Sequence, residues 1–394
     1  MQNHELFTKL DEILNYISVE IGERLTGSEN NKKVEAYVEN YFKNQGYDVE
    51  LQQFDCLDFK TADAELTFKD ETIPVKPSYY TTGCSVTGEY VKIETVEELK
   101  RSDLTDKIAV LHGDLTKEQI MPKNFPFYNP EKHQEIVQIL EEKNPAAIVT
   151  IVEKDGSIFE DGDFAIPSVY VSKNEGEVLL KNNGEIKLVI NAAKEDSHGA
   201  NVIARLNPKK RRKLVVTAHM DTKTGTPGAL DNATGIAILL LLSHLIKPED
   251  IDFCLELLLL NGEDYYSIPG QLAYMETYLQ KPEDILLAIN CDGVGLKKSS
   301  TAVFLTECDS ATEGLLNPII LNSTGMDFIA PWFQGDHMLF ALKHIPTIAF
   351  TSSGIFQILE TIIHTEKDTV NLVDDEKVIK VVRVIEEIIK VFKK

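Results

Sequence analysis

The chain has 394 residues, and its 40 Lys and Arg against 63 Asp and Glu give a formal net charge of −23. This balance excludes an overall basic surface, so we expect neither nucleic acid nor an anionic membrane to be a main partner. Hydrophobic residues make up 43% of the chain, which is typical of a globular protein, and the length predicts about two or three domains.

The opening MQNHELFTKLDEIL lacks the basic segment and apolar core of a secretory signal. No stretch approaches the roughly 18 consecutive apolar residues that cross a bilayer. The five cysteines form no CxxC pair, so neither a disulfide framework nor a cysteine-rich zinc site is expected. We therefore expect a cytoplasmic protein without a membrane partner, and the sequence leaves oligomers possible.

Residues 1–56 predict two helices followed by a strand. Apolar residues recur at helical spacing from Leu6 to Ile17 and again from Val34 to Phe42, with Gly46 as the stop signal. Residues 57–195 differ, because short alternating runs such as YVKI, KIAVL and PSVYV are separated by turn-rich stretches. Only one clear helix, HQEIVQILEEK, stands among them. This segment predicts a smaller β-rich domain inserted into the chain.

Residues 196–394 alternate between apolar strands and helices. The strands are KLVVTAH, FCLELLLLNG, ILLAINCDG, AVFLTE and IPTIAFTSS, and the helices include GIAILLLLSHLI and the amphipathic C-terminal segment. This alternation predicts an α/β domain with a mixed, mostly parallel central sheet flanked by helices. The basic run KKRRK (209–213) lies between two predicted strands and is expected to form an exposed hairpin turn.

Acidic and imidazole side chains follow three of these strands. LVVTA is followed by His219 and Asp221, and FCLELLLLNG is followed by Glu263 and Asp264. Asp292 stands two residues after LLAIN. The carboxyl ends of parallel strands form the edge at which ligands bind in open α/β sheets. Burying so many carboxylates there is costly unless cations compensate them. The sequence therefore predicts a cation cluster at this edge.

Two further residues complete the candidate site. Asp231 stands in GALDNATG at the start of the long apolar helix, and His364 stands in IIHTEKDT. Taken alone, Asp231 could be a helix cap and His364 a loop histidine. A mixed set of imidazole and carboxylate ligands suits Zn²⁺, with Co²⁺ or Mn²⁺ as possible substitutes.

The number of ligands indicates two metal ions. Five ligands exceed the three that one catalytic zinc usually takes from a protein, whereas two ions can share a bridging carboxylate. The neighbours Glu263 and Asp264 would then supply one metal ligand and one general base, because adjacent residues at a strand end point in different directions.

In this order, HMD, GALDNATG, NGED, NCDG, GDH and IIHT resemble the motifs of the M28 zinc aminopeptidases. RLTGSENNKKVEAYVENYFKNQGYDVE is similar to the amino-terminal region of that family. The resemblance covers 1–56 and 196–394, which would form the catalytic domain. Residues 57–195 resemble an inserted protease-associated (PA) domain in DKIAVL, KNPAAIVTI and AIPSVYVS.

The resemblance implies a role for each residue of the site. Asp231 would bridge two zinc ions, with His219 and Asp292 on one ion and Asp264 and His364 on the other. Glu263 would be the general base, and Asp221 would hold the His219 ring. A cis peptide bond would join Asp231 to Asn232.

Three positions depart from the family pattern. Asp264 stands where Glu is commoner, which predicts an adjusted metal spacing, and GDH (335–337) replaces SDH. Trp332 stands where some members have a Tyr that stabilises the oxyanion. Trp332, Phe333 and Phe356 are candidates for an apolar pocket, and Asp336 and His337 of GDH are assigned to the same substrate-binding region.

The activity implied is that of a di-zinc aminopeptidase that removes the N-terminal residue from a peptide with a free N-terminus. Three alternatives remain open. The first is a single-zinc acyltransferase of the glutaminyl-cyclase kind, and the second is a carboxypeptidase or dipeptidase on the same metal pair. The third is a relative that binds ligands without catalysis.

Overall fold

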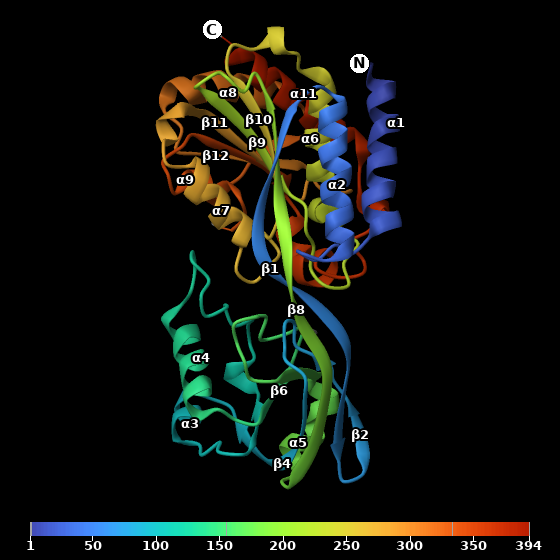
Figure 1. Ribbon diagram of the computed structural model, residues 1–394, viewed down its shortest axis with the longest axis vertical. Coiled ribbons are helices and arrows are strands. Elements are labelled where there is room, and N and C mark those ends of the chain that lie inside the picture. Colours follow the sequence, from blue (N-terminus) through green and yellow to red (C-terminus); the bar gives the residue numbers. More distant parts are fainter. Residues whose placement is uncertain (1, 155, 333, 394) are drawn as a thin grey trace. The chain divides into compact units, whose positions relative to one another are not determined.

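Figure 1 shows the computed structural model of the protein, which describes residues 2–154, 156–332 and 334–393. The chain divides into two compact units: unit 1 consists of Met1–Cys56 and Ser197–Lys394, and unit 2 of Leu57–Asp196. The long strands β1 (Asp48–Phe68) and β8 (Glu185–Leu206) contribute residues to both units.

Unit 1 contains a mixed sheet in the order β13-β12-β14-β11-β9-β10-β8. Four neighbouring strands, β14, β11, β9 and β10, run parallel, whereas β12 and β8 are antiparallel to their neighbours in this group. The bounds are β9 (Lys213–His219), β10 (Cys254–Leu260), β11 (Ile285–Cys291), β12 (Thr301–Thr306), β13 (Met326–Phe328) and β14 (Thr347–Ser352). The parallel strands therefore end at one edge of the sheet, which is the edge that the sequence predicts for the site.

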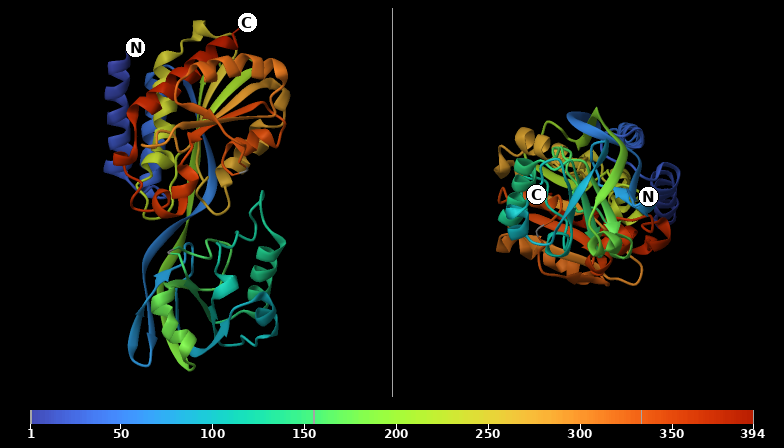
Figure 2. Two further views of the ribbon diagram at one scale, coloured as in Figure 1. Left: turned by 180° about the vertical axis from the view of Figure 1, so that it is seen from behind. Right: turned by 90° about the horizontal axis from the view of Figure 1, so that it is seen from below.

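Helices cover both faces of this sheet, as the left view of Figure 2 shows. The helices are α1 (Asn3–Leu14), α2 (Glu29–Asn44), α6 (Thr234–Leu245), α7 (Pro269–Tyr278), α8 (Ser310–Asn322), α9 (His337–Ala341), α10 (Ile355–Ile358) and α11 (Asp375–Val391). The short segments are η1 (Asn15–Ile21), η3 (Ala229–Ala233), η4 (Pro248–Asp250), η5 (Pro282–Asp284), η6 (Leu359–Ile363) and η7 (Val370–Leu372). Helices α1, α2, α6 and α11 share one core with one face of the sheet, and α7 and α9 pack on the other face.

Helix α6 lies at the centre of the larger core. Residues from Thr234 to Ser243 are all buried, which is why this helix is apolar all round rather than on one stripe. It packs against β9 and is covered by α1, α2 and α11. By contrast, α2 is amphipathic, and the Ser28 side chain caps it by accepting a hydrogen bond from the Asn31 N–H. Burial of α6 fixes η3, the segment directly before it, at the sheet edge.

Unit 2 also contains parallel strands. Strands β4, β5, β6 and β7 are parallel neighbours, while β8 and β3 pair antiparallel at the two ends of the group. The bounds are β2 (Glu71–Pro74), β3 (Lys76–Pro77), β4 (Cys84–Ile93), β5 (Ile108–Leu111), β6 (Ala147–Val152), β7 (Ser168–Ser172), α3 (Val96–Arg101), η2 (Gly113–Leu115), α4 (Glu131–Lys143) and α5 (Lys173–Lys181). Residues of α3 and α4 join one apolar core, and Leu179 of α5 joins a second.

The sheet and its helices confirm the predicted fold class, and two local predictions need correction. The described residues of unit 2 form three α-helices rather than the single clear one expected, because α3 and α5, with six and nine residues, are too short for a helical period to stand out. The run 209–213 joins β8 to β9, but these strands do not form a hairpin, because β10 lies between them.

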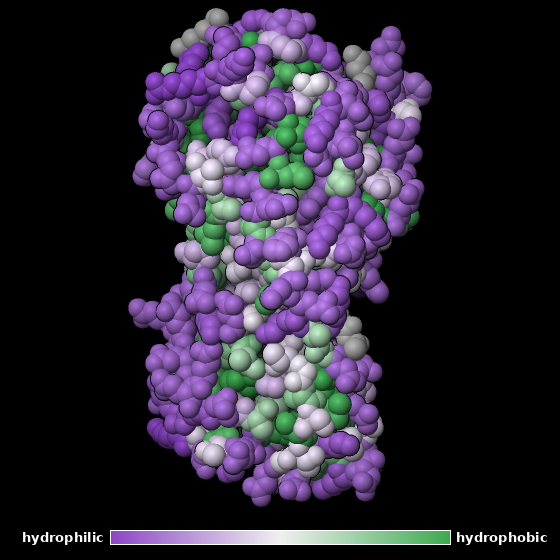
Figure 3. All heavy atoms as spheres, viewed as in Figure 1, coloured by the Kyte–Doolittle hydropathy of each residue, from purple (hydrophilic) through white to green (hydrophobic). Residues whose placement is uncertain are grey.

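The face shown in Figure 3 is covered mainly by hydrophilic side chains, as the charged composition predicts. Among the helices in the described ranges, none is both long and apolar enough to cross a membrane.

Candidate metal centre

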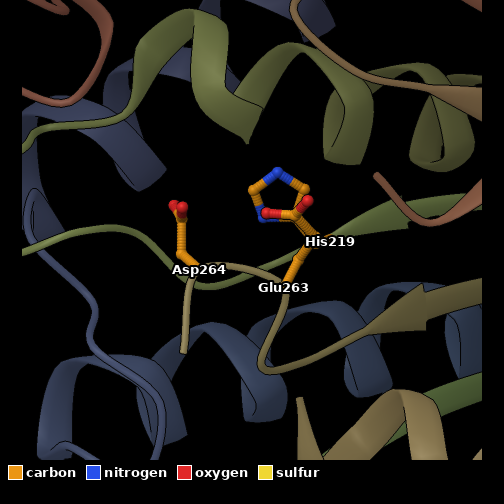
Figure 4. A group of neighbouring side chains, drawn as sticks. All are labelled: His219, Glu263 and Asp264. Carbon is orange, nitrogen blue, oxygen red and sulfur yellow. The ribbon is translucent and has the colours of Figure 1, made fainter. Parts of the chain in front are cut away.

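The structure brings together six of the predicted site residues at the carboxyl end of the unit 1 sheet. Four of them, His219, Glu263, Asp264 and Asp292, lie at or directly after the ends of parallel strands. The other two, Asp231 and His364, come from the motifs GALDNATG and IIHTEKDT. Figure 4 shows three of them, His219, Glu263 and Asp264, with their side chains pointing the same way from neighbouring strand ends. Asp231 lies in η3, directly before the buried helix α6.

Asp231 lies at the centre of the group. Its Oδ1 atom is 2.9 Å from Nε2 of His219, and its Oδ2 atom is 3.0 Å from Nε2 of His364. Each oxygen of one carboxylate therefore faces a different histidine. The peptide bond between Asp231 and Asn232 is cis, which confirms the prediction from the resemblance.

The potential ligand atoms form three groups, within each of which all atoms lie within 4.8 Å of one another. One group is His219, Asp231 and Asp292, and another is Asp231, Asp264 and His364. These two groups share Asp231 alone. The third group consists of His219, Glu263 and Asp264. It shares one residue with each of the other two groups, so the Glu263 carboxylate lies beside both of those groups.

Burial and mutual repulsion shift the pKa values of the acidic groups. Burial raises the pKa of Glu263 well above its usual range, and the charge of Asp264 adds to the effect although His219 opposes it. Burial and then the charge of Asp231 raise the pKa of Asp264 to about 7. Burial also opposes the charged form of Asp231, but the adjacent rings of His219 and His364 hold the pKa of that carboxyl well below its usual range.

The two histidines show the converse behaviour. Burial disfavours the imidazolium of His219, but the surrounding carboxylates, Asp221 first, raise its pKa well above the usual value. Burial likewise opposes the charged form of His364, and Asp231 raises its pKa. The site therefore concentrates acidic groups in a buried place, where bound cations would compensate their charge.

Asp221 holds the loop that carries Glu263 and Asp264. Its Oδ1 atom accepts hydrogen bonds from the backbone N–H groups of Gly262 (2.8 Å) and Glu263 (3.2 Å). Its Oδ2 atom accepts from the Asp264 N–H (3.0 Å) and from the Thr26 hydroxyl (2.9 Å). The nearest approach to His219, Oδ1 to Nδ1, is 3.6 Å, which is too long for a hydrogen bond. Asp221 therefore positions the loop directly.

Sequence reasoning missed two residues beneath the site, Arg24 and Asp368. Arg24 is fully buried, and its guanidinium donates hydrogen bonds to the carbonyls of Met220 (2.6 Å), Pro227 (2.8 Å) and Gly228 (2.9 Å). Burial lowers the pKa of Arg24 to about 10, although nearby carboxylates, Asp368 foremost, oppose this shift. Arg24 stands in RLTGSE, so its position beside a motif was its only signal.

Asp368 is also fully buried, four residues after His364. Its carboxylate accepts hydrogen bonds from the N–H groups of Leu230 and Asp231. Burial raises the pKa of Asp368 to about 7, and the two N–H groups oppose this effect. IIHTEKDT contains this residue, but nothing in the sequence distinguishes it from an exposed loop acid.

A cavity of about 120 Å³ opens beside the six site residues. Its lining combines the carboxylates of Asp231, Glu263 and Asp292 with apolar side chains, namely those of Trp332, Ile355, Phe356, Leu359 and Ile363. Trp332 and Phe356 are thus placed beside the carboxylates, and their rings lie 5.5 Å apart in an edge-to-face arrangement. The prediction for Phe333 falls outside the described residues.

Asp336 and His337 do not belong to the described lining of this cavity. Asp336 is buried, accepts a hydrogen bond from Gln271 (2.9 Å) and has its pKa raised to about 7 by burial. The His337 ring packs edge-to-face on Phe304 and Trp332, and its Nε2 atom bonds to the Trp332 carbonyl (3.0 Å). These contacts place His337 behind Trp332, as a support for the cavity wall.

The residues present fit a pair of metal ions. Both ring nitrogens of His219 and the Oδ2 atom of Asp264 are buried without a hydrogen bond, although buried polar atoms normally have a partner. Imidazole nitrogen and carboxylate oxygen are the donors that zinc takes in catalytic sites. Two three-residue groups that share one carboxylate match the ligand pattern of a two-metal site.

Comparisons with known proteins agree with this site. Residues 201–389 match the model of peptidase family M28, and this range contains all six clustered residues. A probable lipoprotein aminopeptidase, LpqL, from Mycobacterium tuberculosis is 25% identical over 244 residues, which are 59% of this chain and 46% of that protein. The chain thus spans less than half the length of this relative.

Solved structures share the fold over nearly the whole chain. An aminopeptidase from Aneurinibacillus sp. strain AM-1 is 20% identical, with a TM-score of 0.75 and coverage of 97% of this chain and 92% of that one. BSAP, a zinc aminopeptidase from Bacillus subtilis, is 18% identical, with a TM-score of 0.77 and coverage of 97% and 94%. At these identities the likeness establishes the fold.

Proposed function

We propose that the protein, whose residues 201–389 match the model of peptidase family M28, is a di-zinc aminopeptidase that removes the N-terminal residue from peptides. The observation that carries this proposal is the carboxylate of Asp231, whose two oxygens face His219 and His364 at 2.9 Å and 3.0 Å. Asp292 would complete the first zinc site and Asp264 the second. Two complete groups favour two ions over the single-zinc alternative.

Bound zinc ions would acidify a water molecule and polarise the carbonyl of the scissile peptide. The role of this chain is then to move the proton. Glu263 belongs to neither of the two groups that share Asp231, yet its carboxylate lies next to both. It would take a proton from the attacking water as the C–O bond forms and pass it to the leaving nitrogen as the C–N bond breaks. Burial raises the pKa of Glu263, which makes its carboxylate a stronger proton acceptor.

The cavity would receive the first residue of the substrate. Asp231, Glu263 and Asp292 belong to its lining, so the free α-amine of a peptide, which is cationic, would bind near carboxylates. The apolar lining residues, among them Trp332 and Phe356, would contact an uncharged side chain. An N-acetylated peptide lacks the cationic amine and would be a poor substrate.

We also propose that unit 2, which corresponds to the expected segment 57–195, is an inserted PA-like domain. Its support is the resemblance of DKIAVL, KNPAAIVTI and AIPSVYVS together with the strands that these segments form, β5, β6 and β7. These strands are parallel and carry helices on both faces.

The substitution Glu263→Gln tests the mechanism. It keeps the size of the side chain and removes the base, so turnover of a free peptide should fall by roughly 10²–10⁴-fold while zinc content stays at two ions per chain. The matched control is Glu276→Gln, which changes an exposed residue of α7. A zinc-loaded Glu263→Gln protein that keeps a tenth or more of the activity would exclude Glu263 as the base.

A further inference from the structure

Three consecutive backbone N–H groups before the metal centre are bound by one residue, Asp368. Its Oδ1 atom accepts from the Leu230 N–H at 2.9 Å and its Oδ2 atom from the Asp231 N–H at 3.0 Å. Its own carbonyl oxygen accepts from the Ala229 N–H at 3.3 Å. Residue 368 lies 137 positions after Asp231, so this contact joins two distant segments that both carry candidate ligands.

The other end of the segment is also fixed. The Asn232 side chain donates to the carbonyl of Cys291 (2.9 Å) and accepts from the Gly235 N–H (3.0 Å). Arg24 holds the preceding turn through the carbonyls of Pro227 and Gly228. The backbone of Asp231 is therefore bonded before, at and after the residue, which leaves its carboxylate little freedom.

Both oxygens of the Asp368 carboxylate are used in this contact. Here each N–H donor meets a different oxygen of the side chain, and Asp supplies an acceptor at both places. Asn supplies one acceptor, and its amide NH₂ would face the second N–H donor. A fully buried acid close to another acid is costly by itself, so its presence needs a compensating role.

We infer that Asp368 is a positioning residue that fixes the orientation of the carboxylate shared by both metal ions. The inference rests on the proposed function for the identity of the ions, but it concerns how tightly they are held. Asp231 belongs to both ligand groups, so loss of the Asp368 contact should weaken both ions together. Asp292 belongs to only one of the two groups that share Asp231. Its loss should therefore weaken the binding of one ion and leave the binding of the other unchanged.

The test measures zinc binding of the full-length protein by competition with a chromophoric chelator. In Asp368→Asn, the affinity for both ions should fall at least tenfold, and the absorption spectrum of the Co²⁺-loaded protein should change for both equivalents. In Asp292→Asn, one binding step should weaken. The matched control is Asp309→Asn, because the Asp309 side chain accepts from the Thr312 N–H at the start of α8 and should affect stability without affecting zinc.

Each outcome decides the inference. Wild-type affinity for either ion in Asp368→Asn, with only a lower melting temperature, would show a purely structural role and overturn it. If that variant does not fold, Asp368→Glu keeps both acceptors with one extra methylene; its affinity for both ions should fall, and unchanged affinity for either overturns the inference. A wild-type protein that binds no zinc would refute the proposed function. If the wild type binds two ions and Asp368→Asn binds them with the same affinity, only the positioning role is refuted.

Discussion

The substitution Asp221→Asn should release the loop that carries Glu263 and Asp264. Asp221 is fully buried and accepts four hydrogen bonds, three of them from consecutive N–H groups of this loop. Burial opposes its charged form, but the nearby His219 ring and the hydrogen bonds from the loop and Thr26 hold the pKa of Asp221 below its usual value. In the variant, an amide NH₂ would replace the oxygen that accepts from the Asp264 N–H.

The cost follows from these contacts. A hydrogen bond to a charged group contributes about 1.5–3 kcal/mol, and a buried donor left without a partner costs about 1–3 kcal/mol. The free energy of opening this loop should therefore fall by roughly 3 kcal/mol or more. At about 1.4 kcal/mol per factor of ten, this predicts amide hydrogen exchange about a hundredfold faster for Gly262–Asp264.

Hydrogen exchange followed by mass spectrometry on the metal-free protein measures this effect directly. Thr26→Val is the matched control, since it removes one hydroxyl bond to the same carboxylate and leaves the three loop contacts in place; its exchange should rise less than tenfold. Exchange in Asp221→Asn within threefold of wild type would refute the assignment of Asp221 as the residue that holds the loop.

Three further changes have expected outcomes. Adding zinc to metal-free protein should raise the melting temperature progressively, because binding at 100 times the dissociation constant stabilises by about 2.7 kcal/mol, and a melting temperature independent of zinc would contradict the site. Burial raises the pKa of Glu35 to about 7, so its contribution to stability is present below its unfolded value of 4.5 and is lost as the pH rises through 7. Between about pH 5 and 7, the unfolding free energy of metal-free protein, measured by urea titration, should therefore fall less steeply in Glu35→Gln than in the wild type. Equal slopes in the two proteins would argue against this role of Glu35. Trp332→Ala should lower kcat/KM about 10-fold or more for peptides that begin with Leu or Phe and change it little for those that begin with Ala, and an equal loss for all three would exclude Trp332 from the pocket wall.

The sequence was sufficient to predict which residues gather at the sheet edge, for a physical reason. His219, Glu263, Asp264 and Asp292 each follow a buried apolar run, and parallel strands bring their carboxyl ends to one edge. The fold class is confirmed by the sheet and by the solved structures that share it, and the match of residues 201–389 to peptidase family M28 supports the metallopeptidase interpretation. The roles of the individual ligands and of Glu263 stay predictions.

Other features depend on contacts that leave no local pattern. Arg24 and Asp368 act on backbone groups 196 and 137 positions away, and a buried arginine or aspartate looks like a solvated one in sequence. The wrong prediction of a hairpin at 209–213 has a similar cause. Nothing in the sequences of β8 and β9 indicates that β10, which comes later in the chain, lies between them in the sheet. In unit 2, α3 and α5 are held by Leu99 and Leu179 in two separate cores rather than by long apolar stripes.

Hydrolysis of a matched peptide panel by the zinc-loaded protein tests the central claim most directly. Each peptide is offered with a free and with an acetylated N-terminus, and the products are identified by mass spectrometry. The proposed aminopeptidase should remove single residues in steps from the free peptides and leave the acetylated ones intact. Cleavage of acetylated peptides, or release of residues from the carboxyl end, would contradict it.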